Sequence, residues 1–447
     1  MRKHITVPTT GTLLLWIAIG LVSGASTDAS HDEQRHRDPV IRWNRIANEI
    51  FPAHIGPILD SRAMAILHAA IHDAVNGIER RYEPYAADLS YPGASVDTAV
   101  ASAARDVMLA LTFDEVQRIE QEYAAALAEV PDGPAKDQGV LLGQQAARAS
   151  LDRRLPDGIV AGPWPPQQGP ITEPVYTPTG QPGDYAFTPP FDAPPFGPLA
   201  LFPGWGRVAP FVIDVERHRL KGPDPLGSKR YANDLNFLEA YGSLHNSART
   251  PDQTNTAFFW FEPFGIWNDI AATVLQRVPA NPWRTARILA LLNFALADAE
   301  IACFAAKYEF RFWRPYTAIR RADEDDNRET SADPEWLPLL STPPGEPLRF
   351  FIPPIPDYPS AAAMTSAAAA EVLTKHLGDS VAFDVTSTTL PGVARHFRSF
   401  DQAAREAGLS RVYGGIHFVR AVEDGWAAGQ RVGREVARKL PRANRRH

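Results

Sequence analysis

The sequence predicts an all-α protein, because apolar residues recur at three- and four-residue spacing over much of its 447 residues. The clearest amphipathic helix is expected at 61–78, where Asp60 or Ser61 supplies the N-cap. Its apolar stripe consists of Ala63, Ile66, Leu67, Ala70, Ile71 and Ala74. A longer helix with the same core spacing is expected at 282–306, and an Ala-rich helix is expected after Ser360.

The remaining helices are interpreted as packing elements. They are expected at 96–111, 114–129, 135–155 and 228–243, in a capped segment that leads into 258–260, and from residue 266 onward. His68 and His72 lie one turn apart on the first helix, a spacing that could suit a metal. No third ligand follows at a suggestive distance, so two packed histidines are favoured.

Length and composition limit the classes of function. A chain of this length with 45% hydrophobic residues can bury a substantial core in one large domain or two smaller ones. Its net charge of −7 argues against nucleic-acid binding, which requires a basic surface. Its single cysteine, Cys303, excludes an internal disulfide and is interpreted as a buried core residue.

The first 25 residues have the pattern of a secretory signal peptide. Arg2 and Lys3 precede an apolar stretch at 13–22, and Ser23-Gly24-Ala25 resembles a cleavage site. The mature protein is therefore expected to be secreted or periplasmic, with an uncleaved N-terminal anchor as the alternative.

The expected organisation after the signal peptide is a tail and lead-in at 26–58, a single helical domain at 59–440 and a basic tail at 441–447. Residues 156–227 combine frequent Pro and Gly with Phe and Trp, which flexible linkers lack, so an ordered irregular excursion is expected there. It could border a substrate entrance or only cover the surface. The candidate anion site lies in the half formed by 281–440.

Three short segments in this half carry the residues of an anion site. Lys307 and Arg314 are seven residues apart, so one helix would place both on the same face. Ser360 precedes a helix, where a hydroxyl and the next amides can bind an anion. Arg411 and His417 add a permanent cation and a nitrogen that can donate, attack or ligate.

The order and spacing of these segments resemble the superfamily of vanadium-dependent haloperoxidases and type 2 phosphatidic acid phosphatases. Its pattern is Lys, six residues, Arg-Pro; then Pro-Ser-Gly-His; then Ser-Arg, five residues, His, three residues, Asp. The first segment matches fully, the second at Pro359 and Ser360, and the third from Ser410 through His417.

The resemblance extends over nearly the whole mature chain and is closest to the bacterial haloperoxidase-like branch. It is carried by Trp43-Asn44, Asp73-Ala74-Val75-Asn76, Arg249-Thr250, Phe312-Trp313-Arg314-Pro315, Pro356-Asp357-Tyr358-Pro359-Ser360 and Gly414-Gly415-Ile416-His417-Phe418. It implies an α-helical bundle of the haloperoxidase and acid-phosphatase type.

The resemblance also implies the cofactor and the role of each site residue. Vanadate is the expected cofactor, with phosphate as a possible substitute. Lys307, Arg314 and Arg411 would neutralise its oxygens, and Ser360 and the amide of Ala361 would donate hydrogen bonds. His417 would be the vanadium ligand of a peroxidase or the nucleophile of a phosphatase. Lys307 would also polarise peroxide, and the metal would act as a Lewis acid.

Two positions depart from the family pattern. Ala362 stands where the family has its acid/base histidine, a group worth roughly 10²–10⁴-fold in rate. A native activity is therefore expected to be weak, to use another group or water, or to differ in kind. Four side chains are considered as replacements: Tyr358, Thr365, Ser366 and His396.

The second departure is Ala421, where the family has an aspartate that orients the ligand histidine. Glu423, Asp424 or a backbone carbonyl could take over that contact, and the sequence leaves the choice open. Arg249 could pair with a carboxylate near the site or form an ordinary surface salt bridge.

Two acidic residues interrupt the longest apolar stretch after the leader. Asp298 and Glu300 lie within 288–304, so the mature chain is expected to lack an integral membrane span. Since buried carboxylates need partners, at least one of them is expected to orient a basic residue of the site.

Three functions remain open at this point. The preferred one is a secreted vanadate-binding haloperoxidase-like oxidoreductase that uses hydrogen peroxide to oxidise halide, weakened by the loss of the histidine at 362. The second is a soluble acid-phosphatase-like hydrolase that acts on a phosphate ester through His417. The third is a non-catalytic oxyanion-binding protein. Homo-oligomerisation is left open.

Overall fold

The computed structural model describes residues 38–442, except 56, 113, 158, 160–169, 262–264 and 343–348. The expected signal peptide at 1–25, the charged residues up to 37 and the end of the basic tail at 443–447 lie outside the described residues.

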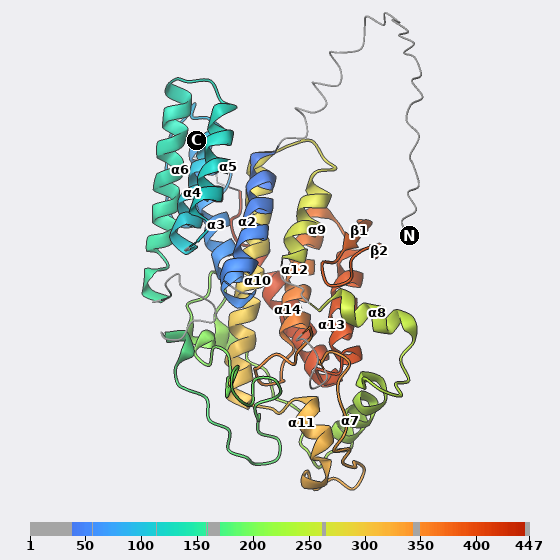
Figure 1. Cartoon of the computed structure of the whole chain (residues 1–447). Coiled ribbons are helices and arrows are strands. Elements are labelled where there is room, and N and C mark those ends of the chain that lie inside the picture. Colours follow the sequence, from blue (N-terminus) through green and yellow to red (C-terminus); the bar gives the residue numbers. More distant parts are fainter. Residues whose placement is uncertain are drawn as a thin grey trace, which may run out of the picture.

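The prediction of an all-α protein is confirmed, and the helices form two groups that lie side by side (Figure 1). The first group consists of α2 (Pro39–Ile55), α3 (Pro57–Ile78), α4 (Val96–Leu111), α5 (Val116–Ala128) and α6 (Pro134–Asp152). Within it, α4 and α6 approach closely at Gly143, where a Cβ atom would lie 2.4 Å from the carbonyl oxygen of Ala99. Only glycine permits that backbone contact.

The second group begins with α7 (Lys229–Gly242), α8 (Pro251–Phe259), α9 (Ile266–Leu275) and α10 (Pro282–Phe310). It continues with α11 (Pro315–Arg320), α12 (Ala361–Leu377), α13 (Phe400–Tyr413) and α14 (Val419–Val436). Short 3-10 turns lie at Leu155–Asp157, Pro170–Thr172, Trp205–Arg207, Val215–His218 and Ala322–Glu324.

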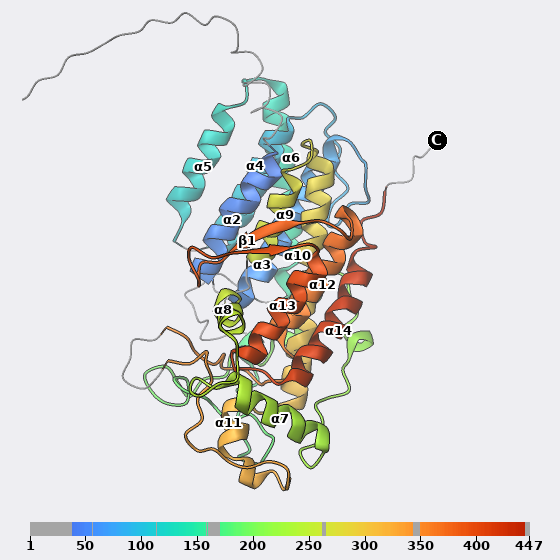
Figure 2. The same cartoon turned by 90° about the vertical axis from the view of Figure 1, so that its right-hand side faces the viewer.

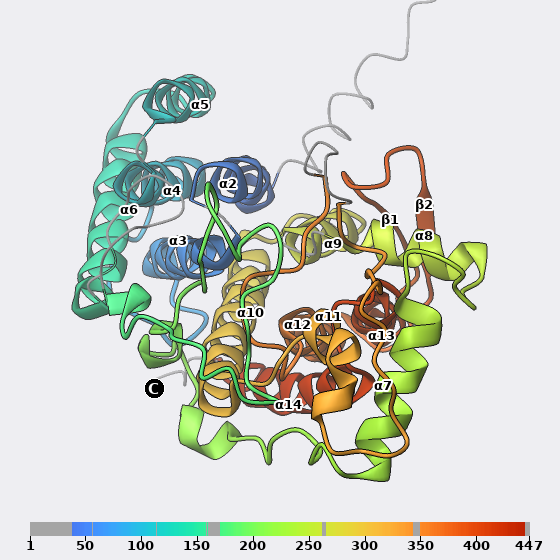
Figure 3. The same cartoon turned by 60° about the horizontal axis from the view of Figure 1, so that its bottom comes forward.

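Helix α10 is the central element and lies between the two groups, as the view from below shows (Figure 3). It packs against α3 on one side and against α12 and α14 on the other. By length and composition α10 is apolar enough to cross a membrane, but 89% of its most apolar 18-residue stretch is buried inside the protein. Its core positions include Leu289, Leu292, Ala295, Ala299 and Cys303.

Several regular elements were not expected from the sequence, including α11 and α13. Helix α2 lies within 39–55, which was interpreted as a lead-in without a helix. An antiparallel hairpin of β1 (Phe383–Thr386) and β2 (Ala394–Phe397) crosses the outside of the second group (Figure 2). Its inward residues Phe383, Val385 and Phe397 join the main core.

The segment after α6 is irregular where the structure describes it. Tyr185, Phe202 and Trp205 are fully or almost fully buried. A Cβ atom on Gly206 would lie 2.4 Å from Cα of Ala305, so this segment packs directly on α10. Trp313 N–H donates to the Gly183 carbonyl and Tyr185 N–H to that of Arg311, which ties the segment to the chain beside Arg314.

Candidate functional site

The three sequence segments meet where α10 and α13 end and α11, α12 and α14 begin, at the lower end of the second group in Figure 1. Lys307 lies in the last turn of α10, and Arg314 immediately precedes α11. Ser360 caps α12, Arg411 lies in the last turn of α13, and His417 precedes α14. The site therefore draws on five helix ends.

One local prediction was wrong, because Lys307 and Arg314 do not share a helix. Arg311 adopts the left-handed conformation at φ 53° and ends α10, with its N–H bonded to the Lys307 carbonyl. Pro315 then begins α11, as proline favours the first helical turn. The sharp turn, rather than a common helix face, brings Arg314 back towards the site.

Arg314 is fully buried and directly contacts another predicted site residue. Its Nη1 lies 3.2 Å from Nε2 of His417. The rest of the guanidinium is held by three carbonyl oxygens. Nε donates to Ile355 at 2.7 Å, Nη1 to Ile416 at 2.7 Å and Nη2 to Pro353 at 3.1 Å.

Lys307 is also fully buried, and the loop before Ser360 holds its ammonium group. Nζ donates to the carbonyls of Pro356 at 2.7 Å and Asp357 at 2.9 Å. Burial lowers the pKa of Lys307 to about 8, and the Arg314 charge contributes to that decrease. Lys307 is thus a cation at neutral pH whose proton is held less tightly than that of an exposed lysine.

The contact with Arg314 defines the protonation state of His417. A guanidinium can only donate, so Nε2 accepts, and the proton of a neutral imidazole resides on Nδ1. Burial first, then the charges of Arg314, Lys307 and Arg411, holds the pKa of His417 well below its ordinary value. His417 is therefore neutral, with the lone pair of Nε2 directed at the basic cluster.

Asp357 is the site residue that the sequence analysis did not recognise. Its Oδ1 lies 2.9 Å from Nδ1 of His417 and 3.9 Å from Nη1 of Arg314, and all three side chains are buried. Burial raises the pKa of Asp357 to about 7, against the opposing effect of Arg314 and Lys307. The available signal was a carboxylate three positions before the serine of the second segment.

The two acidic residues proposed to replace Asp at 421 do not contact His417. Asp424 accepts the Tyr358 hydroxyl at 2.6 Å and pairs with Arg420 at 2.9 Å. Glu423 is exposed and lines a surface cavity. The partner of His417 comes instead from the loop before α12.

Arg411, Ser360 and Ala361 lie on the elements that surround this centre. Arg411 donates to the carbonyls of Trp260 and Phe261 while its charge lowers the pKa of His417. The buried Ser360 hydroxyl accepts the Ala363 N–H at 3.4 Å and can still donate. Ala361 begins α12, so its amide lies at the helix N-terminus, where N–H groups favour anions.

The four side chains considered as replacements for the missing histidine each bind another group of the protein. Tyr358 donates to Asp424, and the Thr365 hydroxyl donates to the Ala361 carbonyl within its own helix. Ser366 accepts from the Trp267 indole, and His396 pairs with Asp384 on the exposed hairpin. Ala362, in the first turn of α12, is partly exposed.

Two further expectations about charged residues were wrong. Asp298 accepts the N–H groups of residues 211–213, and Glu300 accepts the Ser61 hydroxyl at 2.7 Å, so neither orients a basic residue of the site. Arg249 donates to the carbonyls of Tyr241 and Ser243 rather than to a carboxylate. These side chains satisfy backbone and hydroxyl groups that lie far away in the sequence or in neighbouring segments, which sequence spacing does not reveal.

The paired histidines of α3 are packed in the core. His68 Nε2 lies 2.9 Å from Asn44 Oδ1, and His72 Nε2 lies 3.1 Å from the Glu83 carbonyl. Within the described part of the chain, no group of three or more His, Cys, Asp or Glu side chains could hold a metal ion. Cys303 is buried, as expected.

The donor set at the site fits a multiply charged oxyanion such as vanadate or phosphate. Lys307, Arg314 and Arg411 bring three buried positive charges to a neutral His417, whereas the adjoining Asp357, with a pKa of about 7, brings at most one negative charge. Carbonyl dipoles cannot neutralise that excess, and buried charge is costly without a counter-ion. A tetrahedral anion with two negative charges would balance it.

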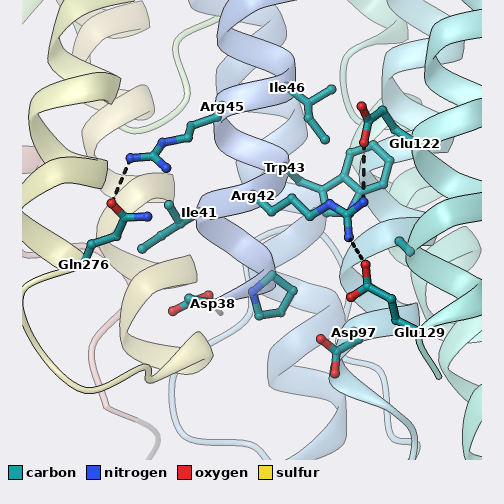
Figure 4. A pocket seen from close by; sticks show the side chains of 12 residues that line it. Asp38, Ile41, Arg42, Trp43, Arg45, Ile46, Asp97, Glu122, Glu129 and Gln276 are labelled. Carbon is teal, nitrogen blue, oxygen red and sulfur yellow. Dashed lines mark hydrogen bonds and ion pairs between the residues drawn. The ribbon is translucent and has the colours of Figure 1, made fainter. Parts of the chain in front are cut away.

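A cavity of about 490 Å³ lies far from this centre, beside α2 and α5 (Figure 4). Arg42 pairs there with Glu129 at 3.0 Å and Glu122 at 3.4 Å, and Arg45 donates to Gln276 at 2.8 Å. Its arginines are therefore satisfied by side chains of the cavity itself, and none of the predicted site residues lines it.

Comparison with known proteins gives consistent similarities. Residues 287–445 match the family model of the VCPO second helical-bundle domain. The vanadium chloroperoxidase of Curvularia inaequalis is 25% identical over 481 positions, which cover 85% of this chain and 77% of that protein.

Solved structures share the fold. The first bacterial vanadium-dependent iodoperoxidase superposes with a TM-score of 0.75 at 24% identity, covering 92% of this chain and 98% of that one. A holo-type bacterial vanadium-dependent chloroperoxidase gives a TM-score of 0.66 at 16% identity, covering 91% and 94%.

Proposed function

We propose that this chain, which is similar to vanadium-dependent haloperoxidases, is a vanadate-binding oxidoreductase that uses hydrogen peroxide to oxidise halide. The observation that carries the proposal is the buried cluster in which Arg314 contacts Nε2 of His417 while Lys307 and Arg411 lie within electrostatic reach. The signal pattern at 1–25 supports export of the protein to the periplasm or medium.

Each residue has a defined task in this proposal. His417 offers the Nε2 lone pair as the vanadium ligand, and Arg314, Arg411 and Lys307 neutralise the oxygens. Ser360 and the Ala361 amide donate from the start of α12. Vanadate, when bound, supplies a Lewis-acid centre that activates peroxide without a change of oxidation state. Phosphate can occupy the same donors.

Lys307 and the residue at position 362 determine which groups can donate or accept a proton during the reaction. With a pKa near 8, Lys307 can donate a hydrogen bond as a cation and is the titratable donor nearest to neutral pH among the three cations. Ala362 cannot accept or return a proton. We therefore expect halide oxidation to be slow, because proton transfer at that position must use water.

The test uses the full chain incubated with orthovanadate, hydrogen peroxide and bromide, with bromination of a phenolic dye as the readout. His417→Ala is expected to abolish vanadate-dependent bromination, whereas His396→Ala on the exposed hairpin is the matched control and should retain it. Bromination that survives His417→Ala contradicts the proposal. Phosphate-ester turnover without vanadium that is lost in His417→Ala would assign the protein to the hydrolases instead, and oxyanion binding without either activity would make it a binding protein.

A further inference from the structure

A second basic cavity lies at the opposite ends of the helices that form the oxyanion site. Helix α10 begins there, and α12 and α14 end there, with a volume of about 280 Å³ between them. Arg287 and Lys307 are 20 residues apart on α10, which places the two sites about 30 Å from each other. The cavity is lined by Tyr82, Arg284, Arg287, Ile288, His376 and Arg442.

Backbone carbonyls fix the arginines of this cavity. Arg287 donates through Nε to Leu440 at 2.5 Å and through Nη2 to Lys439 at 3.4 Å, and its guanidinium lies 5.0 Å from the centre of the Tyr82 ring. Arg284 Nη2 donates to the His376 carbonyl at 3.1 Å. The guanidinium groups are thus held in place before any ligand arrives, which reduces the entropic cost of binding.

His376 adds no positive charge to the cavity. Its Nδ1 lies 3.3 Å from Nη1 of Arg287 and must accept, while Nε2 donates to the Ala437 carbonyl at 3.1 Å. Burial and the neighbouring charges of Arg287, Lys375 and Arg284 lower the pKa of His376 to about 4. The cations are therefore the arginines, with Lys375 nearby.

No carboxylate side chain is among the residues that line this cavity. Burial and the charge of Arg442 both lower the pKa of Arg287. This concentration of like charge occurs in a chain whose net charge is −7. Arg284 and Arg287 have a structural role, because they donate to carbonyls at and just after the ends of α12 and α14. That role does not account for the presence of the Arg442 side chain in the same cavity.

We propose that this cavity is a second anion-binding site, which takes a phosphate or sulfate group as a free ion or as the terminal group of a small metabolite. Guanidinium groups bind such oxyanions through paired N–H donors, and the half-buried Arg284 and Arg287 supply donors beyond those used on the carbonyls. The volume accommodates the anion together with a short organic group.

The test is equilibrium dialysis of the full chain against radiolabelled inorganic phosphate, with Arg442→Gln as the main variant. The Arg442 side chain is exposed, and the residue pairs with Tyr82 through its backbone, so the variant is expected to stay folded. Loss of one guanidinium should weaken one class of site at least about tenfold. Arg431→Gln, on the exposed face of α14, is the control and should bind like the wild type.

Variants of each site distinguish phosphate binding at the oxyanion site from phosphate binding at the second cavity. His417→Ala should leave phosphate binding at the second cavity unchanged. Arg442→Gln should weaken that binding, and the double variant Arg284→Gln/Arg442→Gln should abolish it. Unchanged affinity and stoichiometry in both arginine variants would overturn the proposal. Competition with sulfate and with glycerol 3-phosphate then distinguishes the two sources, because tighter binding of the monoester identifies a metabolite and equal binding identifies the free anion.

Discussion

Asp357 places Oδ1 2.9 Å from Nδ1 of His417, on the side of the imidazole opposite the nitrogen that faces Arg314. The family pattern has its orienting carboxylate at the position of Ala421, on α14, whereas here the carboxylate comes from the loop before α12. The Ser360 N–H donates to the Ala421 carbonyl at 2.9 Å, so this loop and the start of α14 are joined directly. We therefore expect a carboxylate at position 421 to lie near the same imidazole.

Replacing Asp357 by alanine is expected to weaken vanadate binding about 10- to 100-fold, because His417 loses the buried carboxylate beside Nδ1 that helps to hold its ring in place. Asp357→Asn should lose less, since it keeps a polar group of the same size beside Nδ1 of His417 and removes only the charge. Equilibrium dialysis against vanadate measures both effects. The addition of Ala421→Asp to the Asp357→Ala variant should recover most of the affinity.

The matched control for that series is Asp424→Asn, which removes a nearby carboxylate bound to Tyr358 rather than to His417. It should change vanadate affinity little. Equal losses in Asp357→Ala and Asp424→Asn, or no recovery with Ala421→Asp, would show that Asp357 acts on the fold rather than on the histidine.

Arg314→Lys is expected to be a severe change despite the conserved charge. The guanidinium of Arg314 satisfies three buried carbonyl oxygens and contacts His417, and a single ammonium group cannot reach them all. Unsatisfied carbonyls should lower the free energy of unfolding by about 2–4 kcal/mol, and vanadate affinity should fall at least tenfold. Urea denaturation and dialysis measure the two effects.

The control for Arg314→Lys is Arg320→Lys on the adjoining helix α11. Arg320 donates to one carbonyl, that of Trp336, at 3.2 Å. This variant should change the free energy of unfolding by less than about 1 kcal/mol and leave vanadate affinity intact. An Arg314→Lys protein with wild-type affinity would contradict the assignment of Arg314 as a vanadate-binding residue.

The sequence predicted the helices well where apolar periodicity and capping agreed. Helix α4 has the predicted bounds, and α3, α5, α6 and α7 differ by a few residues at their ends. Helix α2 was missed because β-branched and aromatic residues at 40–43 weaken the local helix signal, and packing against α3 decides its conformation. The hairpin at 383–397 was missed because two four-residue strands carry little periodic information.

For the candidate site, the sequence predicted which residues converge but not how each is held. Motif spacing led to Arg314 and His417, which are in contact. It did not reveal the loop carbonyls that hold Lys307, because any residue type presents a carbonyl. Asp357 was overlooked since its partner lies 60 residues further along the chain, a pairing that only the folded backbone creates.

Restoring histidine at position 362 is expected to raise vanadate-dependent bromination about 100-fold or more, because an imidazole there can accept and return a proton. Ala362 is partly exposed in the first turn of α12, where a larger side chain has room. Ala362→Asn adds a polar side chain without basicity and is the control, with little gain expected. If Ala362→His gives no increase while vanadate binding stays intact, the role assigned to this position is wrong.

Glu300 is expected to make the stability of the protein depend on pH. It is buried on α10, accepts the Ser61 hydroxyl at 2.7 Å, and burial raises its pKa from 4.5 to about 8. The folded state therefore binds this proton more tightly than the unfolded chain. The resulting stabilisation is complete below pH 4.5 and is lost as pH rises through 8. Between pH 5 and 8.5 the loss should be on the order of 4 kcal/mol.

Glu300→Gln removes that titration while keeping an oxygen that accepts from Ser61, so its free energy of unfolding should vary less with pH than that of the wild type. The neighbouring Asp60, whose pKa is raised by burial and by Glu300, should titrate more normally in the variant and flatten the profile further. Urea denaturation at intervals between pH 5 and 8.5 measures both profiles, and the exposed Glu423→Gln serves as the control with the wild-type slope. The variant should be more stable than the wild type at pH 8.5 and no more stable at pH 5. If the two pH profiles are parallel instead, Glu300 is ionised in the folded state throughout this range.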